Sequence, residues 1–253
     1  MPHREPTMEG DIHHIFNRGV DKRKIFLNDQ DYLRFILSLY ILNDSNNKYD
    51  IWSNLNFNKQ NTLKILSSTT GRSGRSTTGR SGRPVVDEIR KKLVEILAFI
   101  LMPNHYHLII RVLSDNGLSK FMQKVGMGYS QYFNKQNQRS GALFEGRYKN
   151  VPIKSDEQLN IIFNYVHTNP VELVEPGWKN TGVESKDKAI YQQNTYAWSS
   201  YNDYVGKSKF ALITDRDFYL DIFGGPNGCR ESVENWIEFK AQIANAPEYL
   251  KKI

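Results

Sequence analysis

The sequence predicts a mixed α+β domain, in which an antiparallel sheet carries helices on one face, followed by a mainly helical C-terminal extension. Three observations support this prediction. Short apolar segments have the length and residue types of strands, longer segments between them have helical periodicity, and two of the strand segments are joined by a tight turn. An order of strand, helix, hairpin, helix, strand and helix needs few parallel connections.

The first strand is expected over residues 11–18, because apolar residues alternate there and Gly19 ends the run. A helix is expected from Asp29, which we interpret as its N-cap. Its apolar and aromatic residues recur three and four positions apart, as on one helix face: Tyr32, Phe35, Ile36, Leu39 and Tyr40.

A β-hairpin is expected next. Residues 93–102 form a continuous apolar run, Pro103-Asn104 is typical of a turn, and residues 105–112 are rich in strand formers. Because the first run has no polar alternation, at least one of the two strands should be well buried.

Two helices and one strand follow the hairpin. Residues 118–133 carry an apolar stripe at helical spacing, and residues 147–153 are expected to form a strand. Ser155 or Asp156 then caps a helix that ends at Asn169-Pro170, because a residue before proline is pushed out of the α region. This order of elements is close to a ferredoxin-like antiparallel sheet.

We expect two parts in the chain: a domain over residues 1–175 and an extension over 176–253 that packs on it. In the extension, the polar stretch from Pro176 to Asn194 is expected to be a long loop, whereas residues 218–223 and 231–244 are expected to be helical.

A tandem octapeptide, STTGRSGR, occupies residues 68–75 and 76–83 and is followed by Pro84. Gly, Ser, Thr and Arg in this proportion offer nothing to bury, so residues 67–84 should form a flexible loop. We favour a tolerated insertion over a basic arm that contacts phosphates. The net charge is +7, and without the four arginines of the repeats it is +3, with 30 basic against 27 acidic residues.

The single cysteine, Cys229, excludes an intramolecular disulfide framework and a cysteine-rich zinc finger. The longest apolar run is far shorter than a membrane span, and the polar N-terminus does not have the apolar stretch of a signal peptide. We therefore expect a soluble, cytoplasmic protein without membrane partners.

His105 and His107 are two residues apart on a predicted strand, so their side chains share one face and Tyr106 faces the other. Two adjacent imidazoles can bind one divalent metal, although such a pair also arises by chance. Of the neighbours His13 and His14, at most one can face the same site. An incomplete ligand set suits Mg²⁺ or Mn²⁺, which completes its shell with water and substrate phosphate oxygens.

A phosphodiester polarised by such a metal needs a nucleophile, and two of the 14 tyrosines have a polar amide one helical turn later. Tyr165 precedes Asn169, and Tyr132 precedes Gln136. Tyr132 lies within the apolar stripe of its helix, which favours a core position. Tyr165 lies off the apolar row of its helix, so the pattern slightly favours Tyr165.

Five segments together resemble a known family: HHIFNRGVDKRKIF (13–26), MPNHYHLII (102–110), LFEGRYKNVPI (143–153), NYVHTNPVELV (164–174) and YAWSSYNDYVG (196–206). The chain resembles, from about residue 10 to 225, the REP-associated tyrosine transposases, within the single-strand DNA transposases that carry a His-hydrophobe-His motif and one catalytic tyrosine. Tyr106 stands where a small aliphatic residue is usual, and the octapeptide repeats look like an addition.

The resemblance implies a ferredoxin-like catalytic domain that cuts single-stranded DNA at hairpin (REP-like) elements and forms a covalent 5′-phosphotyrosine. It implies that Tyr165 is the nucleophile, that His105 and His107 bind Mg²⁺ or Mn²⁺, and that Asn169 is a third metal ligand. It implies no small-molecule cofactor, and it leaves a monomer or a homodimer open.

DNA contacts are expected from basic residues near aromatic ones. Arg18, Arg147 and Lys149 are candidates for phosphate contacts and Tyr148 for base stacking; Arg18 and Arg147 are favoured because they lie inside family-like segments. His167 is interpreted as an ordinary helix-surface residue.

Two other functions fit the same pattern. A non-catalytic nucleic-acid-binding module would use a ferredoxin-like sheet without chemistry. A zinc hydrolase would use the same two histidines with a tightly held metal.

Overall fold

The computed structural model describes residues 7–45, 91–207 and 209–244. Its elements follow along the chain as β1 (Ile12–Arg18), η1 (Val20–Lys22), α1 (Asp29–Ile41), β2 (Val94–Met102), β3 (His105–Val112), α4 (Gly117–Gln136), β4 (Lys149–Ile153), α5 (Asp156–Thr168), η3 (Asn169–Leu173), α6 (Trp178–Thr181), α7 (Lys186–Thr195), α8 (Tyr201–Tyr204), α9 (Asp217–Phe223) and α10 (Pro226–Ala244). The octapeptide repeats at 68–83 lie outside the described residues.

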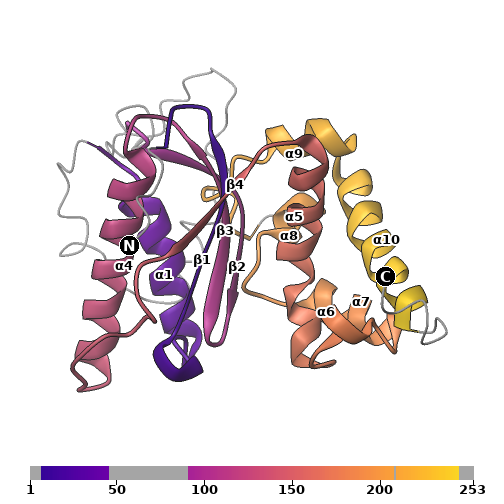
Figure 1. Ribbon diagram of the computed structural model, residues 1–253, viewed down its shortest axis with the longest axis horizontal. Helices are drawn as coiled ribbons and strands as arrows, with labels where there is room; N and C mark the ends of the chain where they lie inside the picture. Colours follow the sequence, from indigo (N-terminus) through magenta and orange to yellow (C-terminus); the bar gives the residue numbers. More distant parts are fainter. Residues whose placement is uncertain (1–6, 46–90, 208, 245–253) are drawn as a thin grey trace, which may run out of the picture.

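Four antiparallel strands form the sheet in the order β2-β3-β1-β4, with β1 and β3 in the centre. Helices α1 and α4 cover one face, and α5 with the C-terminal helices covers the other (Figure 1). The predicted α+β fold with a helical C-terminal region is therefore confirmed. The strand order is the one that two interleaved β-α-β units produce in a ferredoxin-like sheet.

The two faces of the sheet have separate apolar cores, because successive side chains of a strand point to opposite faces. On the α1 and α4 side, Ile15, Tyr106 and Leu108 pack with Phe35 and Phe121. On the opposite side, the core combines strand residues with residues of α5 and of the C-terminal helices: Ile100, Ile109, Phe163, Val166, Trp178 and Tyr204. The C-terminal helices are thus packed directly on the sheet.

The edge of β2 is covered by the segment between α7 and α8. The backbone N–H of Leu101 donates to Trp198 O at 2.9 Å, and that of Ser200 donates to Phe99 O at 3.0 Å. The Tyr196 hydroxyl also donates to Leu101 O at 2.6 Å. These bonds satisfy backbone groups that an edge strand otherwise exposes.

The N-cap of α1 is Asn28, so the assignment of Asp29 as the cap was wrong. The side-chain oxygen of Asn28 accepts hydrogen bonds from the backbone N–H groups of Gln30 and Asp31. The Asp31 carboxylate in turn accepts from Leu27 N at 2.8 Å. This reciprocal pair explains why the helix begins after Asn28, with Asp29 as its first residue.

The predicted long loop from Pro176 to Asn194 was also wrong, because this stretch contains α6 and most of α7. In α7 only Ala189 and Gln193 are buried. A helix that buries so little apolar surface shows no apolar stripe in the sequence, and for this reason periodicity missed it.

His167 is fully buried, so its interpretation as a helix-surface residue was wrong. Its Nε2 lies 2.9 Å from Ser200 Oγ, which connects α5 to the segment that covers β2. Burial lowers the pKa of His167 to about 3, so the ring is neutral at physiological pH. Within the described residues, no helix combines the length and the apolar character needed to cross a membrane.

Candidate active site

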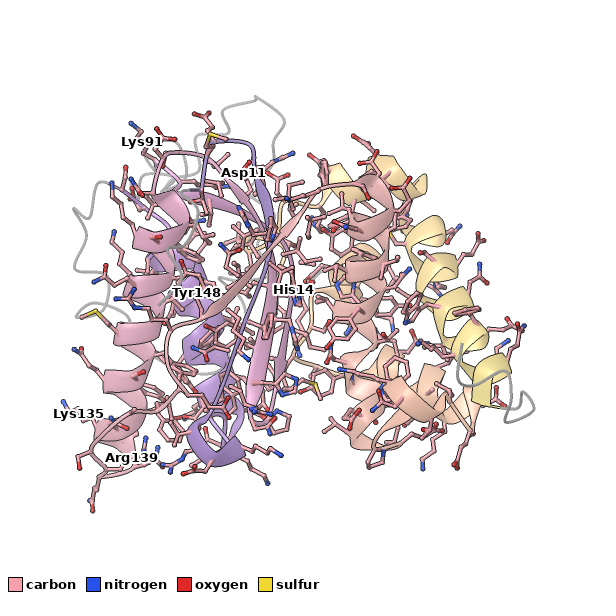
Figure 2. All side chains as sticks on the ribbon, viewed as in Figure 1. Asp11, His14, Lys91, Lys135, Arg139 and Tyr148 are labelled. Atoms are coloured by element: carbon pink, nitrogen blue, oxygen red, sulfur yellow. The ribbon has the colours of Figure 1, made fainter. Side chains whose placement is uncertain are left out.

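Two strands supply a cluster of three imidazoles on the sheet face that α5 covers. His105 and His107 lie on β3, with ring centroids 5.1 Å apart and perpendicular planes. His14 and Phe16 lie on the neighbouring strand β1, where Phe16 pairs with His107. Figure 2 shows His14 between the sheet and α5. Of the two histidines on β1, it is therefore His14 that joins the site.

Hydrogen bonds occupy the Nδ1 atom of both β3 histidines. His105 Nδ1 lies 2.7 Å from the Asn104 side-chain oxygen, which can only accept, so this Nδ1 carries the proton. His107 Nδ1 lies 2.8 Å from His14 Nε2. When His107 donates in that bond, both β3 rings present an unprotonated Nε2, the atom that can ligate a metal.

The three imidazoles are held neutral. Burial, and to a smaller extent the positive charge of Lys179, lower the pKa of His14 to about 4. Burial and then Lys179 lower the pKa of His105 to about 4 as well, and burial lowers that of His107 well below its usual value. Neutral imidazole is the form that binds metals.

Tyr165 extends from α5 toward these histidines. Its ring lies edge-on to His107 with centroids 5.5 Å apart, and edge-on to His14 with centroids 6.0 Å apart. Ser155 caps the N-terminus of α5 by accepting from Gln158 N. The helix buries Phe163 and Val166 in the core, which turns the intervening Tyr165 toward the sheet, where it is partly exposed.

Asn169 lies one turn after Tyr165 and is fully buried. Its amide nitrogen donates to Tyr165 O at 2.7 Å, which aims the side-chain oxygen away from its own helix. That oxygen accepts from Lys179 Nζ at 2.8 Å, and the side chain lies close enough to His105 to raise the pKa of that ring, against the larger effect of burial. The structure thus brings together the four residues that the sequence assigns to the metal and the nucleophile.

Lys179 of α6 was not anticipated from the sequence. Its ammonium nitrogen lies 3.2 Å from the Tyr165 hydroxyl and 4.4 Å from the centre of the Tyr165 ring. It belongs to the stretch expected to be a loop, and a single lysine there resembles any surface lysine. Lys179 contacts Tyr165 because residues 178–181 fold as α6, and no sequence pattern indicated this helix.

The donor set is compatible with an open metal site. Among the described residues, no group of three His, Cys, Asp or Glu side chains could hold a metal ion. The residues that the sequence assigns to the metal supply two imidazoles and the Asn169 side-chain oxygen at this place. Such a set leaves coordination positions for substrate oxygens, as Mg²⁺ and Mn²⁺ sites that act on phosphates require.

Two of the predicted DNA contacts flank the histidines. Arg18 pairs with His105 across the β1–β3 ladder and forms a 2.8 Å ion pair with Glu145. Lys149 pairs with Phe16 across the β1–β4 ladder, and its ammonium nitrogen lies 5.8 Å from the Phe16 ring. Both side chains are exposed.

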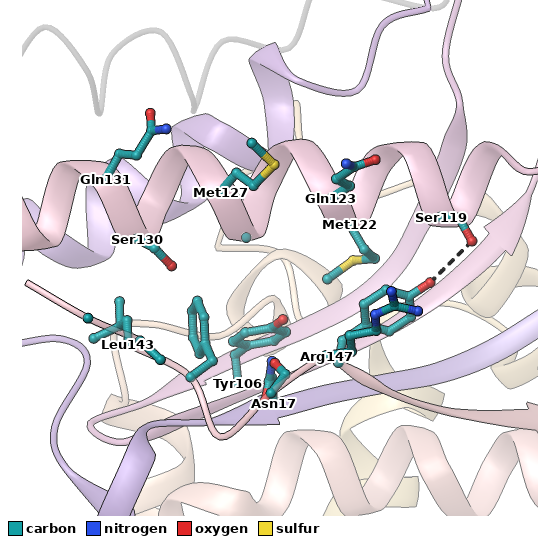
Figure 3. Close-up of a pocket in the computed structure, with 16 residues that line it drawn as sticks. Asn17, Tyr106, Ser119, Met122, Gln123, Met127, Ser130, Gln131, Leu143 and Arg147 are labelled. Carbon is teal, nitrogen blue, oxygen red and sulfur yellow. Dashed lines mark hydrogen bonds between the residues drawn. The ribbon is translucent and has the colours of Figure 1, made fainter. Parts of the chain in front are cut away.

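The other two predicted contacts, Arg147 and Tyr148, lie away from the histidines. They line a pocket of about 680 Å³ between α4 and residues 141–148, on the α4 side of the sheet (Figures 2 and 3). The Tyr148 and Ser119 hydroxyls are 3.5 Å apart across it. The structure therefore does not bring the four predicted DNA contacts into one cluster.

A comparison with protein families identifies one continuous segment of the chain. Residues 81–169 match the family model of IS200-like transposases. This region is similar to an IS200-like transposase. The match confirms the predicted resemblance and supports a transposase role for the chain.

The transposase-like region contains His105, His107, Tyr165 and Asn169, whereas Lys179 follows it. One solved structure, of a REP-associated tyrosine transposase bound to a REP hairpin, is 15% identical to this chain with a TM-score of 0.45. The similarity covers 85% of this chain and 94% of that one. No curated protein matches the chain.

Proposed function

We propose that this protein is a metal-dependent single-strand DNA endonuclease and strand transferase that forms a covalent 5′-phosphotyrosine through Tyr165. One observation carries the proposal: the Tyr165 ring lies against His107, 5.5 Å between centroids, on the face where the buried His105 and His107 rings are each hydrogen-bonded through Nδ1. A phenol and an open metal site at one place are the two components that this chemistry needs.

His105, His107 and Asn169 would hold Mg²⁺ or Mn²⁺. When bound, the metal would neutralise phosphate charge and make the phosphorus more electrophilic. The chain itself positions the reactants: the buried row of α5 fixes Tyr165, and the bonds of Asn104 and His14 fix the two imidazoles. Positioning and charge neutralisation supply most of the acceleration in phosphoryl transfer.

In the cleavage step the Tyr165 oxygen would attack phosphorus, the bond from phosphorus to the 3′ oxygen would break, and the departing oxygen would take up a proton as a 3′ hydroxyl. The energy of the phosphodiester would stay in the phosphotyrosyl bond. A 3′ hydroxyl of another strand would then reverse the step without ATP.

The path of the DNA is part of the proposal. Arg18 and Lys149 would contact phosphates beside the histidines, and Tyr148 would stack an unpaired base in the pocket that Arg147 also lines. The two places lie on opposite faces of the sheet, so the strand would pass around the β4 edge, where residues 147–149 are found. The hairpin element as target is taken from the sequence resemblance.

We also infer that the protein acts in the cytoplasm. The inference is supported by the single cysteine, Cys229, which is a buried free thiol and needs no oxidising compartment. Monomer and homodimer are both compatible with this function.

The decisive experiment is a denaturing gel of the protein with end-labelled single-stranded hairpin DNA and Mn²⁺. We expect a covalent adduct that Tyr165→Phe and EDTA abolish and that duplex DNA does not give. The matched control is Tyr132→Phe, since the Tyr132 hydroxyl donates to Asp31 at 3.0 Å on the opposite face of the sheet. An adduct that persists in Tyr165→Phe would refute the assignment of Tyr165 as the nucleophile.

Other outcomes point to the two other functions. DNA binding that is insensitive to chelator and gives no adduct with any metal would instead mean a non-catalytic nucleic-acid-binding module. Stoichiometric zinc that survives dialysis would favour a hydrolase.

A further inference from the structure

Lys179 is held in place by a well-anchored turn of the C-terminal part. Its neighbour Trp178 is buried in the core beneath the sheet. The turn is closed at both ends: Gly177 N donates to the Glu172 carboxylate at 3.0 Å, and Gly182 N donates to Trp178 O at 2.7 Å. The backbone of Lys179 is therefore fixed relative to η3, which follows Asn169.

The ammonium group has an unusual set of partners. It donates to the Tyr165 hydroxyl and to the Asn169 side-chain oxygen, and it lies over the Tyr165 ring. In the described part of the chain it forms no ion pair with a carboxylate. Its positive charge is felt by His14, His105 and His107, because it contributes to lowering the pKa of each.

A cation at this place is costly for a site that also attracts a metal ion. Like charges a few ångströms apart repel, and burial increases the repulsion. A lysine that served only to fasten α6 to α5 could make its contacts elsewhere on these helices. The position of Lys179 against the phenol oxygen indicates a role that needs charge at that oxygen.

We propose that Lys179 is a catalytic residue that stabilises the negative charge on the Tyr165 oxygen while the bond from this oxygen to phosphorus forms and breaks. The inference rests on the proposed function and deepens it, since it names a group that acts on the nucleophile. It also assigns part of the chemistry to α6, outside the transposase-like region 81–169.

The ammonium keeps all its protons in this role. During cleavage the oxygen–phosphorus bond of Tyr165 forms, the bond from phosphorus to the 3′ oxygen breaks, and the phenolic proton ends on the released 3′ hydroxyl, directly or through solvent. During resealing the same atoms return, and the Tyr165 oxygen departs as an anion. A hydrogen bond from an ammonium stabilises that anion more than it stabilises the neutral phenol.

The hydrogen bond to Asn169 orients the ammonium group of Lys179. Asn169 donates to the backbone of Tyr165 and accepts from Lys179, so one amide holds the lysine and the tyrosine helix in register. Arginine at position 179 would keep the charge with a longer, planar group, whereas methionine would keep the approximate length and remove the charge.

The first test compares single-turnover rates of adduct formation and of resealing in Lys179→Met and Lys179→Arg, at saturating Mn²⁺ and hairpin DNA. We expect Lys179→Met to lower both rates on the order of 100-fold, as loss of one preorganised donor does. Lys179→Arg should recover at least a tenth of the parent rate. The matched control is Lys188→Met, because Lys188 is an exposed lysine of α7 whose ammonium group donates to the Val174 carbonyl, away from the proposed site.

A second test separates charge stabilisation from a structural role. With 3,5-difluorotyrosine at position 165, the phenolate is a better leaving group and needs less stabilisation. The resealing defect of Lys179→Met should then shrink at least tenfold. A defect of unchanged size in the fluorinated protein would overturn the proposal, because a misplaced tyrosine is equally misplaced with or without fluorine.

Different results would refute the role of Lys179 and the proposed function on which it rests. If the parent protein forms no adduct, the proposed function fails and takes the role of Lys179 with it. If the parent forms an adduct through Tyr165 and Lys179→Met reseals at the parent rate, only the role of Lys179 is refuted.

Discussion

The imidazole of His14 lies 2.8 Å from that of His107, Nε2 to Nδ1, and ties the first strand of the sheet to the histidine pair of the third. The two rings are nearly parallel, with centroids 5.0 Å apart. Since His107 is buried, this bond engages its Nδ1 and leaves Nε2 as the nitrogen for the proposed metal.

His14→Leu should therefore weaken Mn²⁺ binding. Loss of the partner leaves the His107 ring free to rotate and to change tautomer, and loss of such a partner costs about 10- to 100-fold in metal affinity. Calorimetric titration with Mn²⁺ measures the effect. His13→Leu is the matched control, since His13 lies on the opposite face of β1. Equal Mn²⁺ affinity in the two variants would contradict the role of His14.

Mn²⁺ affinity should change little between pH 8 and pH 6. The pKa of His105 is about 4, and that of His107 lies well below its usual value, so both rings stay neutral across this range. Two exposed imidazoles with an ordinary pKa of about 6.5 would each lose roughly fourfold in their neutral fraction at pH 6. A rise of about tenfold or more in the Mn²⁺ dissociation constant at pH 6 would show that the rings are solvated.

Stacking by Tyr148 should be measurable with single-stranded DNA alone. Tyr148→Ala should weaken binding of an unpaired oligonucleotide by about 1 to 3 kcal/mol, the usual contribution of a base stacked on an aromatic ring. Fluorescence anisotropy measures this, and Tyr191→Ala is the control because Tyr191 is an exposed tyrosine of α7. Equal losses from both variants would exclude the pocket as a specific contact.

Lys149 should behave differently from Tyr148. A phosphate contact releases counterions, so Lys149→Ala should reduce the slope of log affinity against log salt by about 1. The Tyr148 variant should leave that slope unchanged. An unchanged slope in Lys149→Ala would mean that its ammonium group does not reach the DNA backbone.

Asp203→Asn should stabilise the protein at neutral pH. Asp203 accepts from the backbone N–H groups of Lys209 and Phe210 with one oxygen, while burial raises its pKa to about 6. Because this pKa lies above its ordinary value of 3.8, the folded state binds more protons between these two pH values, and stability falls as pH rises through about 6.

The asparagine variant has no such charge and keeps an accepting oxygen. Its advantage in free energy of unfolding should be small near pH 4 and about 2 to 3 kcal/mol at pH 8. Urea unfolding at the two pH values measures it. An advantage that is the same at both would mean that Asp203 does not titrate with a raised pKa.

The strand and helix pattern of residues 11–45 and 91–170 was predictable because its elements bury regular apolar rows. The hairpin of β2 and β3 is one example, since a continuous apolar run is followed by a proline turn and a second run. The same reasoning put His105 and His107 on one face. What decided between Tyr165 and Tyr132 was the resemblance to a family, because spacing alone left both open.

The contributions of His14 and Lys179 could not be predicted from the sequence. His14 reaches the site through the pairing of β1 with β3, a contact between residues 93 positions apart. Lys179 depends on α6, whose sequence has one buried residue, Trp178, and therefore no periodicity. Both are relationships between elements, and pattern analysis describes each element by itself.

The two edges of the sheet differ in what they offer to another chain. Along β2, backbone groups are already bonded to residues 198–200 of the same molecule. Along β4, Pro152 removes one N–H from a strand of only five residues. Neither border presents an unbroken row of donors and acceptors, so growth of the sheet by pairing copies edge to edge is disfavoured.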